Sequence, residues 1–227
     1  MIITIDGPAG TGKSTVAHAV SQQLGFDFLD TGAMYRAAAL TVLHRRAALD
    51  DPVAIAAAIG DIDIRFDFSR HPPVLLLGGQ PVTDQLRTPE VDQAASIVAA
   101  VAAVRTVLVA LQRDIGRQRP NLVSEGRDQG SVVFPNAAAR FYLDASPHAR
   151  ARRRADQLRA AGVAVDERAL LDEIVARDRR DSTRAVAPLV QPVGAIRIDS
   201  TDLGFQQVVD RIVALSRPLL QQPPAGG

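Results

Sequence analysis

Residues 7–14 are Gly7-Pro8-Ala9-Gly10-Thr11-Gly12-Lys13-Ser14, and they match the pattern G-x-x-x-x-G-K-[ST] at each fixed position. The pattern predicts a phosphate-binding loop, because glycines let backbone N–H groups face anionic oxygens and a lysine can curl over them. Lys13 is the single lysine in a chain that carries 25 arginines. A compact ammonium on a slender stem fits such a loop better than a planar guanidinium, so the choice of residue supports the match.

The segments on either side have the order that a phosphate loop requires. A β-branched apolar run, Ile2-Ile3-Thr4-Ile5, leads into the glycines as a predicted strand, and residues 14–24 follow as a predicted helix. In that setting we expect Lys13 to reach the β and γ phosphates of a nucleotide and the Ser14 hydroxyl to ligate Mg²⁺. The alternative is a plain glycine-rich turn capped by Ser14, which the strand, the helix and the lone lysine together disfavour.

The composition suits one α/β domain with room for a small insertion. The chain has 227 residues, of which 47% are hydrophobic and 22% charged. It contains no cysteine, which excludes disulfides and thiolate metal sites. The first predicted strand begins at Ile2 and no run of about 18 apolar residues is present, so we expect no signal peptide, no membrane span and a cytoplasmic location.

The charge pattern argues against a nucleic-acid partner. The net charge is +1 and aromatic residues make up 4% of the chain, too little for wholesale binding of a phosphate backbone or for base stacking. Arginines nevertheless cluster between residues 150 and 184, which suits a polyphosphate pocket. A solvated helix face at residues 149–158 is the alternative interpretation of that cluster.

Four more predicted strands, at residues 26–30, 121–124, 140–144 and 195–199, alternate with helices that include 31–46 and 90–117. With the first strand they predict a parallel five-stranded sheet flanked by helices, the P-loop NTPase fold. Polar residues follow two of the strands, at Asp30 and at Glu125-Gly126-Arg127-Asp128. Ligands of such sheets bind beyond the carboxyl ends of the strands, so these residues are expected to share a crevice with the phosphate loop.

Between residues 61 and 82 the pattern changes to period two, with turns at His71-Pro72-Pro73 and Gly78-Gly79. This predicts a small antiparallel β meander inserted into the parallel fold. A basic lid is also predicted, because an arginine-dense helix breaks near residue 184 into a small, proline-containing loop that could close over phosphates. The expected division is a core of 1–58, 98–148 and 195–218, an inserted subdomain of 59–97, a lid of 149–192 and a disordered tail of 219–227.

Nearly end to end, the chain resembles the bacterial-type cytidylate kinases (CMP/dCMP kinases) of the nucleoside monophosphate kinase group. The resemblance rests on the phosphate loop through Thr15 and on residues 29–36 (LDTGAMYR), 125–135 (EGRDQGSVVFP) and 184–189 (RAVAPL). The last three motifs discriminate better than the first. The meander at 61–82 also resembles the sheet that this family inserts into its monophosphate-binding region.

The resemblance implies a phosphotransferase that uses ATP with Mg²⁺. It places ATP at Gly7, Pro8, Ala9, Gly10, Thr11, Gly12, Lys13, Ser14 and Thr15. It places CMP at Thr31, Tyr35, Arg36, Ser96, Arg105, Arg127, Asp128, Arg177, Asp181 and Arg184. Catalysis is expected of Lys13, Arg127 and Arg184, and metal ligation of Ser14.

Within the acceptor site the resemblance assigns three kinds of contact. It gives the acceptor phosphate to Arg36, Arg127 and Arg184, whose guanidinium forks suit that group. It gives the cytosine, which has an amine donor and two acceptors, to Asp128, Ser96 and Arg105. It gives the ribose to Arg177 and Asp181, with Thr31 and Tyr35 lining the pocket. The residues by themselves also allow surface ion pairs, a solvated helix face at Ser96 and Arg105, and an i,i+4 bridge between Arg177 and Asp181.

Two acids and two departures complete the predicted site. Asp30 and Glu125 are expected near Mg²⁺ with contact through water, and Glu125 stands where some relatives have Asp. Gln129 replaces an apolar residue of the more familiar motif, and Asn136 replaces an aspartate. Because Gln129 lies beside the predicted base reader Asp128, it could loosen the choice of nucleobase.

The predicted reaction is in-line transfer from Mg·ATP to the 5′-phosphate of CMP or dCMP, giving CDP or dCDP and ADP with no covalent enzyme intermediate. The nearest alternative is another kinase of this fold that acts on UMP, AMP or dephospho-coenzyme A. A nucleotide-dependent switch is a second alternative, but the N-K-x-D element of a GTPase is impossible with Lys13 as the sole lysine. The expected partners are ATP, CMP and dCMP, and the protein is expected to be a monomer.

Overall fold

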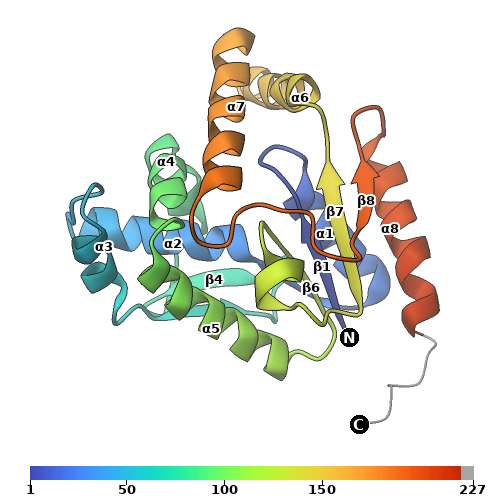
Figure 1. Ribbon diagram of the computed structural model, residues 1–227, viewed down its shortest axis with the longest axis horizontal. Coiled ribbons are helices and arrows are strands. Elements are labelled where there is room, and N and C mark those ends of the chain that lie inside the picture. Colours follow the sequence, from blue (N-terminus) through green and yellow to red (C-terminus); the bar gives the residue numbers. More distant parts are fainter. Residues whose placement is uncertain (221–227) are drawn as a thin grey trace. The chain divides into compact units, whose positions relative to one another are not determined.

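The computed structural model describes residues 1–220 (Figure 1). The chain divides into two compact units, one made of residues 1–26 and 121 onward, and the other of residues 27–120. Helix α8 (Phe205–Leu220) continues to the end of the described residues. A disordered tail was predicted from residue 219, but residues 219 and 220 belong to α8. The rest of the predicted tail, 221–227, lies outside the described residues.

The main sheet has five strands. In spatial order they are β2 (Asp27–Asp30), β6 (Leu122–Gly126), β1 (Ile2–Asp6), β7 (Ala139–Asp144) and β8 (Ile196–Asp199). Strand β1 pairs in parallel with β6 and β7, so that Ile3 lies opposite Val123 on one side and Ala139 on the other. Strand β8 continues the parallel pairing beside β7. The predicted α/β fold with a five-stranded parallel sheet is confirmed.

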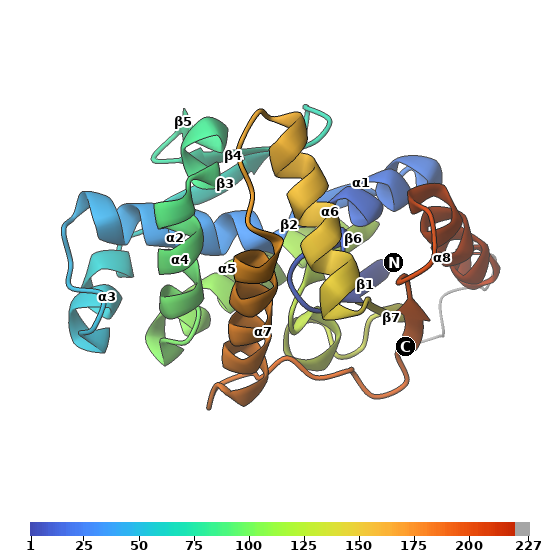
Figure 2. The ribbon, with the colours of Figure 1, turned by 90° about the horizontal axis from the view of Figure 1, so that it is seen from above.

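Helices α1 (Lys13–Leu24) and α8 pack against each other and against strands of the first unit. Figure 2 shows the two helices side by side. The strands below them are rich in β-branched and aromatic residues, and Ile3, Ile5, Phe141 and Leu143 are completely buried. Thr4, whose side chain points to the opposite face of β1, is buried as well. Burial on both faces is typical of a parallel sheet.

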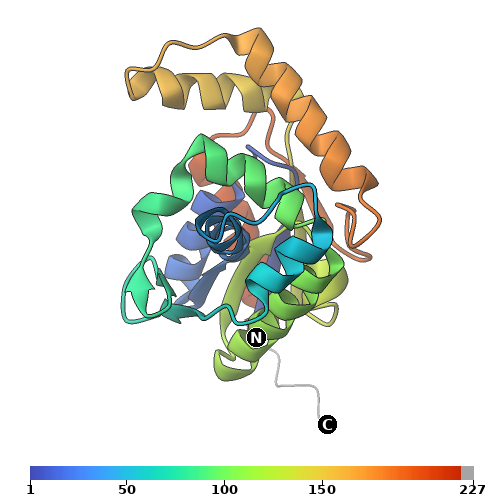
Figure 3. The same ribbon diagram turned by 90° about the vertical axis from the view of Figure 1, so that its left-hand side faces the viewer.

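The arginine-dense segment predicted as a lid forms a helical hairpin of α6 (Pro147–Ala160) and α7 (Glu167–Thr183), which Figure 3 shows from the side. Both helices begin at a capping side chain. Ser146 accepts a hydrogen bond from Ala149 N, and Asp166 accepts from the amides of residues 168 and 169. An irregular segment, 184–195, then leads to β8.

The second unit contains the inserted meander. Strands β3 (Ile64–Asp67), β4 (Val74–Leu77) and β5 (Gln80–Pro81) form an antiparallel three-stranded sheet, which confirms the prediction. Helices α2 (Thr31–His44) and α3 (Pro52–Ile59) precede it, and a 3₁₀ turn, η1 (Thr83–Arg87), follows. Helix α3 lies in a stretch for which no helix was predicted.

The single helix predicted at residues 90–117 is wrong, because the structure contains two helices there. They are α4 (Pro89–Val98) and α5 (Ala102–Gln118), with a bend of 98° between them. No glycine or proline marks the break; Val101 adopts an extended conformation, and the bend allows both Val98 and Val104 to be fully buried. Among the described residues no single helix combines the length and apolar composition needed to cross a bilayer, and α4 with α5 meets that test only as a bent pair.

Candidate functional site

The phosphate-loop motif connects β1 to α1, as the sequence predicted. Helix α1 begins at Lys13, and its N-cap residue is Gly12 in the left-handed conformation. A glycine cap has no side chain that could accept hydrogen bonds from the first turn, so the amide groups and positive end of the helix dipole suit an anion there. Thr11 Oγ1 donates to the carbonyl oxygen of Pro8 across 3.1 Å, which closes the loop on itself.

Gly7 is required by the close approach of strand β7. Its φ is +150°, and a Cβ built at this position would lie 2.0 Å from the carbonyl oxygen of Leu143. A backbone atom cannot move aside as a flexible side chain can, so only glycine fits without displacing the loop. The sequence motif therefore has a steric cause at its first position.

Lys13 folds back over the loop instead of extending into solvent. Its side chain is 5% exposed, and Nζ donates to the carbonyl oxygen of Pro8 across 2.7 Å. Burial, aided by the positive charge of Arg127 and partly opposed by Glu125, lowers the pKa of Lys13 from 10.5 to about 7. An anion beside Nζ would restore the charge of this ammonium, so the surroundings favour a negatively charged ligand.

Three predicted arginines of the first unit surround Asp181. Arg127 Nε donates to Asp181 Oδ2 across 2.9 Å, a contact between the end of β6 and helix α7. Burial acts to raise the pKa of Asp181, but Arg127, Arg177 and Arg184 together hold that pKa below its ordinary value. The structure thus brings these four residues together with Lys13, on whose pKa Arg127, Arg177 and Asp181 all act.

Arg184 lies at the end of α7, where the helix gives way to the irregular segment. Its backbone N–H donates to Arg180 O, and its Nε donates to the carbonyl oxygen of Ala187 across 2.6 Å. Ala187 has a positive φ of 48°, uncommon for a residue with a Cβ. The predicted lid arginine is therefore held in a tight turn that directly continues from the Asp181 region.

Asp6 is a site residue that the sequence analysis missed. It is completely buried at the end of β1, and its two carboxylate oxygens accept hydrogen bonds of 2.7 Å from the backbone amides of Gln129 and Gly130. Burial raises the pKa of Asp6 to about 6, against the effect of those two amides. Asp6 therefore fixes the turn that follows Asp128. Its position in the sequence, directly before the phosphate loop, is the feature by which it could have been identified.

Gln129 does not extend from the site. Its side chain is completely buried, and its Oε1 accepts a hydrogen bond from Ser124 Oγ across 2.8 Å. Asp128, by contrast, is the residue that begins the π-helical turn Gln129–Val133. The Gln129 side chain therefore contacts Ser124 on β6, and its effect on the choice of nucleobase stays a prediction.

The remaining predicted residues belong to the second unit, where α2, α4 and α5 gather them. Arg36 on α2 pairs with Asp92 on α4, with 2.9 Å between Nε and Oδ1. The guanidinium of Arg105 on α5 lies 5.6 Å from the ring centroid of Tyr35 on α2. Arg105 is almost completely buried, so the solvated helix face that was its alternative interpretation is wrong.

Ser96 lies on α4, one turn beyond Asp92. Its Oγ is buried and has no hydrogen-bond partner among the residues that the structure describes. A buried hydroxyl without a partner loses the hydrogen bonds that water would give it, so such a group is a candidate for contact with a ligand. This observation favours the predicted role of Ser96 in reading a base.

Two acids were expected near Mg²⁺. Asp30 is the N-cap of α2, and its Oδ1 accepts from Ala33 N across 2.8 Å. Glu125 is buried and close enough to Lys13 to raise its pKa. Within residues 1–220 no group of three or more acidic, histidine or cysteine side chains could hold a metal ion by itself. Mg²⁺ commonly binds through one or two protein oxygens together with phosphates and water, and Ser14 at the start of α1 fits that mode.

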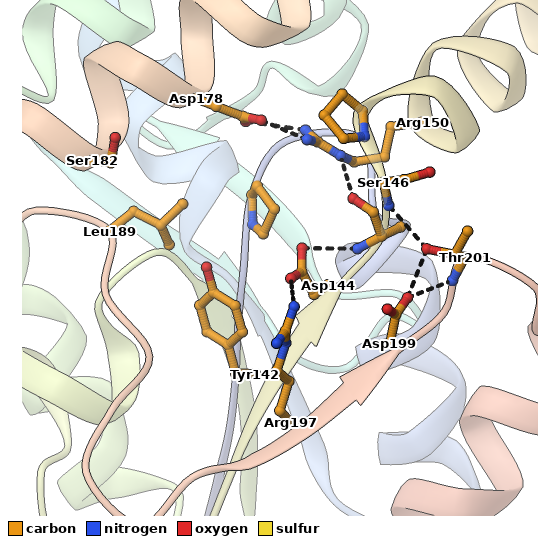
Figure 4. Close-up of a pocket in the computed structure, with 13 residues that line it drawn as sticks. Tyr142, Asp144, Ser146, Arg150, Asp178, Ser182, Leu189, Arg197, Asp199 and Thr201 are labelled. Carbon is orange, nitrogen blue, oxygen red and sulfur yellow. Dashed lines mark hydrogen bonds and ion pairs between the residues drawn. The ribbon is translucent and has the colours of Figure 1, made fainter.

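A cavity of about 480 Å³ opens beside the phosphate loop in the first unit. Figure 4 shows the charged side chains that line it, and most of them bind one another: Arg150 pairs with Asp178 and Arg197 with Asp144. Thr201 joins the turn after β8 to that after β7 by accepting from Ser146 N. The lining therefore stabilises the turns around the loop.

Comparison with known proteins gives a consistent result. A family model described as "Cytidylate kinase" matches residues 3–217. Relatives that carry the name cytidylate kinase include proteins of Edwardsiella ictaluri, 43% identical over 219 residues (96% of this chain and 97% of that protein), and of Marinomonas sp., 45% identical over 214 residues (94% of each). A relative of the same name from Pseudomonas aeruginosa is 44% identical over 214 residues, 93% of each chain.

Solved structures share the fold at much lower identity. A shikimate kinase from Bacteroides thetaiotaomicron has a TM-score of 0.50 and 15% identity, with 98% of this chain and 99% of that chain covered. An uncharacterized protein from Eubacterium ventriosum has a TM-score of 0.51 and 12% identity over the same shares. At these identities the likeness concerns the fold alone.

Proposed function

The chain belongs to the cytidylate kinase family, and from that premise we propose the role of each residue gathered in its two units. The protein catalyses phosphoryl transfer from ATP to CMP or dCMP. The observation that carries the proposed roles is the burial of Lys13 against the phosphate loop together with Arg127, Arg177 and Asp181, which act on its charge.

The phosphate loop binds the donor. The backbone N–H groups of Gly7–Thr15, apart from Pro8, which has none, bind the phosphate chain together with the first turn of α1. Lys13 Nζ moves from Pro8 O to the β and γ oxygens. The Ser14 hydroxyl would hold Mg²⁺, and Glu125 and Asp30 would act on it through water. When bound, Mg²⁺ would neutralise negative charge on the donor phosphates.

Three arginines are assigned to the phosphate of the acceptor. Arg36, Arg127 and Arg184 bind the phosphate of the monophosphate, and the guanidinium of each can present two parallel N–H groups to its oxygens. To bind the ligand, Arg36 must give up its hydrogen bond to Asp92. Arg184 must likewise give up its hydrogen bond to the carbonyl oxygen of Ala187. Each arginine is thereby oriented before the phosphate arrives.

The nucleoside is read by polar groups that are already ordered. Asp128 accepts from the cytosine amine, while Ser96 and Arg105 donate to its ring acceptors. The buried Ser96 hydroxyl supports this assignment, because a ligand would supply its missing partner. Asp181, oriented by Arg127 and Arg177, binds the ribose hydroxyls, and Thr31 and Tyr35 line the pocket.

The mechanism requires positioning and charge neutralisation but no nucleophile from the protein. The attacking group is an oxygen of the acceptor phosphate, already anionic, so no strong general base is needed. Lys13, Arg127 and Arg184 stabilise the charge that spreads over the transferred group. The lid must close first, since an open site would admit water as a competing acceptor.

We further propose the division of labour among segments. Residues 1–58, 98–148 and 195–218 form the core, 59–97 the acceptor-binding subdomain and 149–192 the lid. The protein acts as a monomer in the cytoplasm, where its nucleotide substrates are present, and it needs neither nucleic acid nor a membrane. Sedimentation that shows a stable dimer would contradict the monomer.

The proposal is tested by ADP release from Mg·ATP with one acceptor at a time: CMP, dCMP, UMP, AMP and dephospho-coenzyme A, with Lys13→Ala as the blank. Fast turnover with CMP and dCMP alone supports the assigned base contacts. Turnover with another acceptor retains the kinase and rejects those contacts. ADP release without dependence on any acceptor contradicts the assignment as a transferase.

A further inference from the structure

Arg150, on helix α6, is an arginine for which the phosphoryl transfer described above has no role. Its side chain is 2% exposed. The guanidinium donates from Nε to Ala145 O across 3.0 Å and from Nη1 to Ala9 O across 2.9 Å. It also donates to both carboxylate oxygens of Asp178, and Figure 4 shows this pair. These bonds use most of the five N–H groups of an arginine, so the side chain is held from several sides.

The three partners of Arg150 come from parts of the first unit with different roles. Ala145 follows strand β7, Ala9 lies in the middle of the phosphate loop, and Asp178 lies on α7, within the proposed lid. Gly10 is packed on the same arginine, since a Cβ at Gly10 would lie 3.4 Å from Arg150 Cβ. One guanidinium thus joins the loop to a lid helix.

The contact with Ala9 has a direct consequence for phosphate binding. A trans peptide is planar, so the carbonyl of residue 9 and the N–H of residue 10 point in opposite directions. When Arg150 holds the Ala9 carbonyl, it therefore also sets the direction of the Gly10 N–H, one of the loop amides expected to face the donor. A change in the position of Asp178 would be transmitted to that peptide through the guanidinium.

We propose that Arg150 is a positioning residue for the phosphoryl donor, which couples the place of helix α7 to the orientation of the peptide between Ala9 and Gly10. The proposal rests on the donor site assigned above. It goes beyond that site because it links closure of the lid to the shape of the phosphate loop through a residue that touches no substrate.

The competing explanation is a buried ion pair that only stabilises the hairpin of α6 and α7, as buried pairs commonly do. The chain offers a matched control. Arg159, near the end of α6, and Glu167, at the start of α7, form a second ion pair across the turn of the same hairpin, with each side chain 50% exposed. Arg159→Met breaks a link of the same kind without a contact to the phosphate loop.

The experiment compares steady-state kinetics of Arg150→Met and Arg159→Met with those of the unchanged protein. We expect Arg150→Met to raise KM for ATP by about tenfold, the scale of one lost charge-assisted positioning bond, with KM for CMP nearly unchanged. Arg159→Met should leave both values unchanged. Equal effects of the two variants, or equal rises in both KM values for Arg150→Met, would overturn the proposal.

A second variant keeps the test decisive if Arg150→Met fails to fold, as judged by circular dichroism. Asp178 is 25% exposed, and Asp178→Asn preserves its shape. By itself it should raise KM for ATP in the same direction by a smaller factor. If Arg150→Met does fold, Asp178→Asn should add nothing further to it, because the two residues act as one unit. An unchanged KM for ATP, or an additive effect, rejects the coupling. Absence of CMP-dependent turnover in the unchanged protein would instead count against the transferase itself.

Discussion

Replacement of Lys13 by methionine should abolish phosphoryl transfer and at the same time make the protein more stable. The pKa of Lys13 falls from 10.5 to about 7 on folding. At roughly 1.4 kcal/mol for each unit of displacement, the folded state holds the charged lysine at a cost of about 5 kcal/mol. Methionine retains the stem of the side chain but loses the bond to Pro8 O, worth about 1 kcal/mol. The expected gain in unfolding free energy is therefore several kcal/mol at neutral pH.

The sign of the pH dependence follows from proton binding. Between pH 7 and 10.5 the unfolded chain binds more protons at Lys13 than the folded chain does, so this group makes stability rise with pH across that window. Urea unfolding of both proteins, from about pH 6 to about pH 10, measures the difference directly. The advantage of Lys13→Met should be largest at the acidic end and shrink toward alkaline pH. A difference that does not vary with pH, or a less stable variant at neutral pH, would show that burial of the Lys13 charge does not destabilise the folded protein.

Three further outcomes are expected. Binding of ATP should be accompanied by proton uptake above about pH 7, because phosphate oxygens restore the charge of Lys13; calorimetry in two buffers of different ionisation enthalpy checks this, and identical heats would contradict it. Arg184→Ala should lower turnover at saturating CMP by about 10²–10³ while ATP binding persists, measured by ADP release and by titration, and unchanged turnover would remove its role. Gly130→Ala places a Cβ 2.8 Å from Thr4 Oγ1 and 3.1 Å from Asp6 Oδ2; it should lower stability by about 1–3 kcal/mol and raise KM for CMP, and an unperturbed melting temperature would show that the turn has more room.

The conformation of the phosphate-loop segment could be predicted from the sequence almost completely, because that segment is local. The glycine spacing and the strand before it predicted where the loop turns, and the close approach of Gly7 to Leu143 O shows why the first glycine is required. Arg127 and Asp181 were predicted to belong to one site, and the structure brings their side chains into contact. Their direct hydrogen bond, between residues 54 apart, could not be derived from spacing.

The features that could not be predicted from the sequence depend on contacts between distant segments. The carboxylate of Asp6 binds amides more than 120 residues away, and Arg150 reaches a carbonyl 141 residues away. On α6 the arginine cluster divides between a buried Arg150 and exposed Arg152 and Arg154, which composition alone cannot distinguish. The break between α4 and α5 likewise arises from packing, since no residue at 99–101 disfavours a helix strongly.

The ratio of kcat/KM for CMP to that for UMP measures whether Ser96, with Asp128 and Arg105, reads the base of the acceptor nucleotide as cytosine. Ser96→Ala is compared with Ser216→Ala, which removes another buried hydroxyl, bonded to Ile212 O in helix α8. Cytosine has a ring acceptor where uracil has an N–H, so loss of a donor should penalise CMP more and reduce the ratio by about tenfold. We expect that reduction for Ser96→Ala and none for Ser216→Ala; an unchanged ratio in Ser96→Ala would rule out base reading by Ser96.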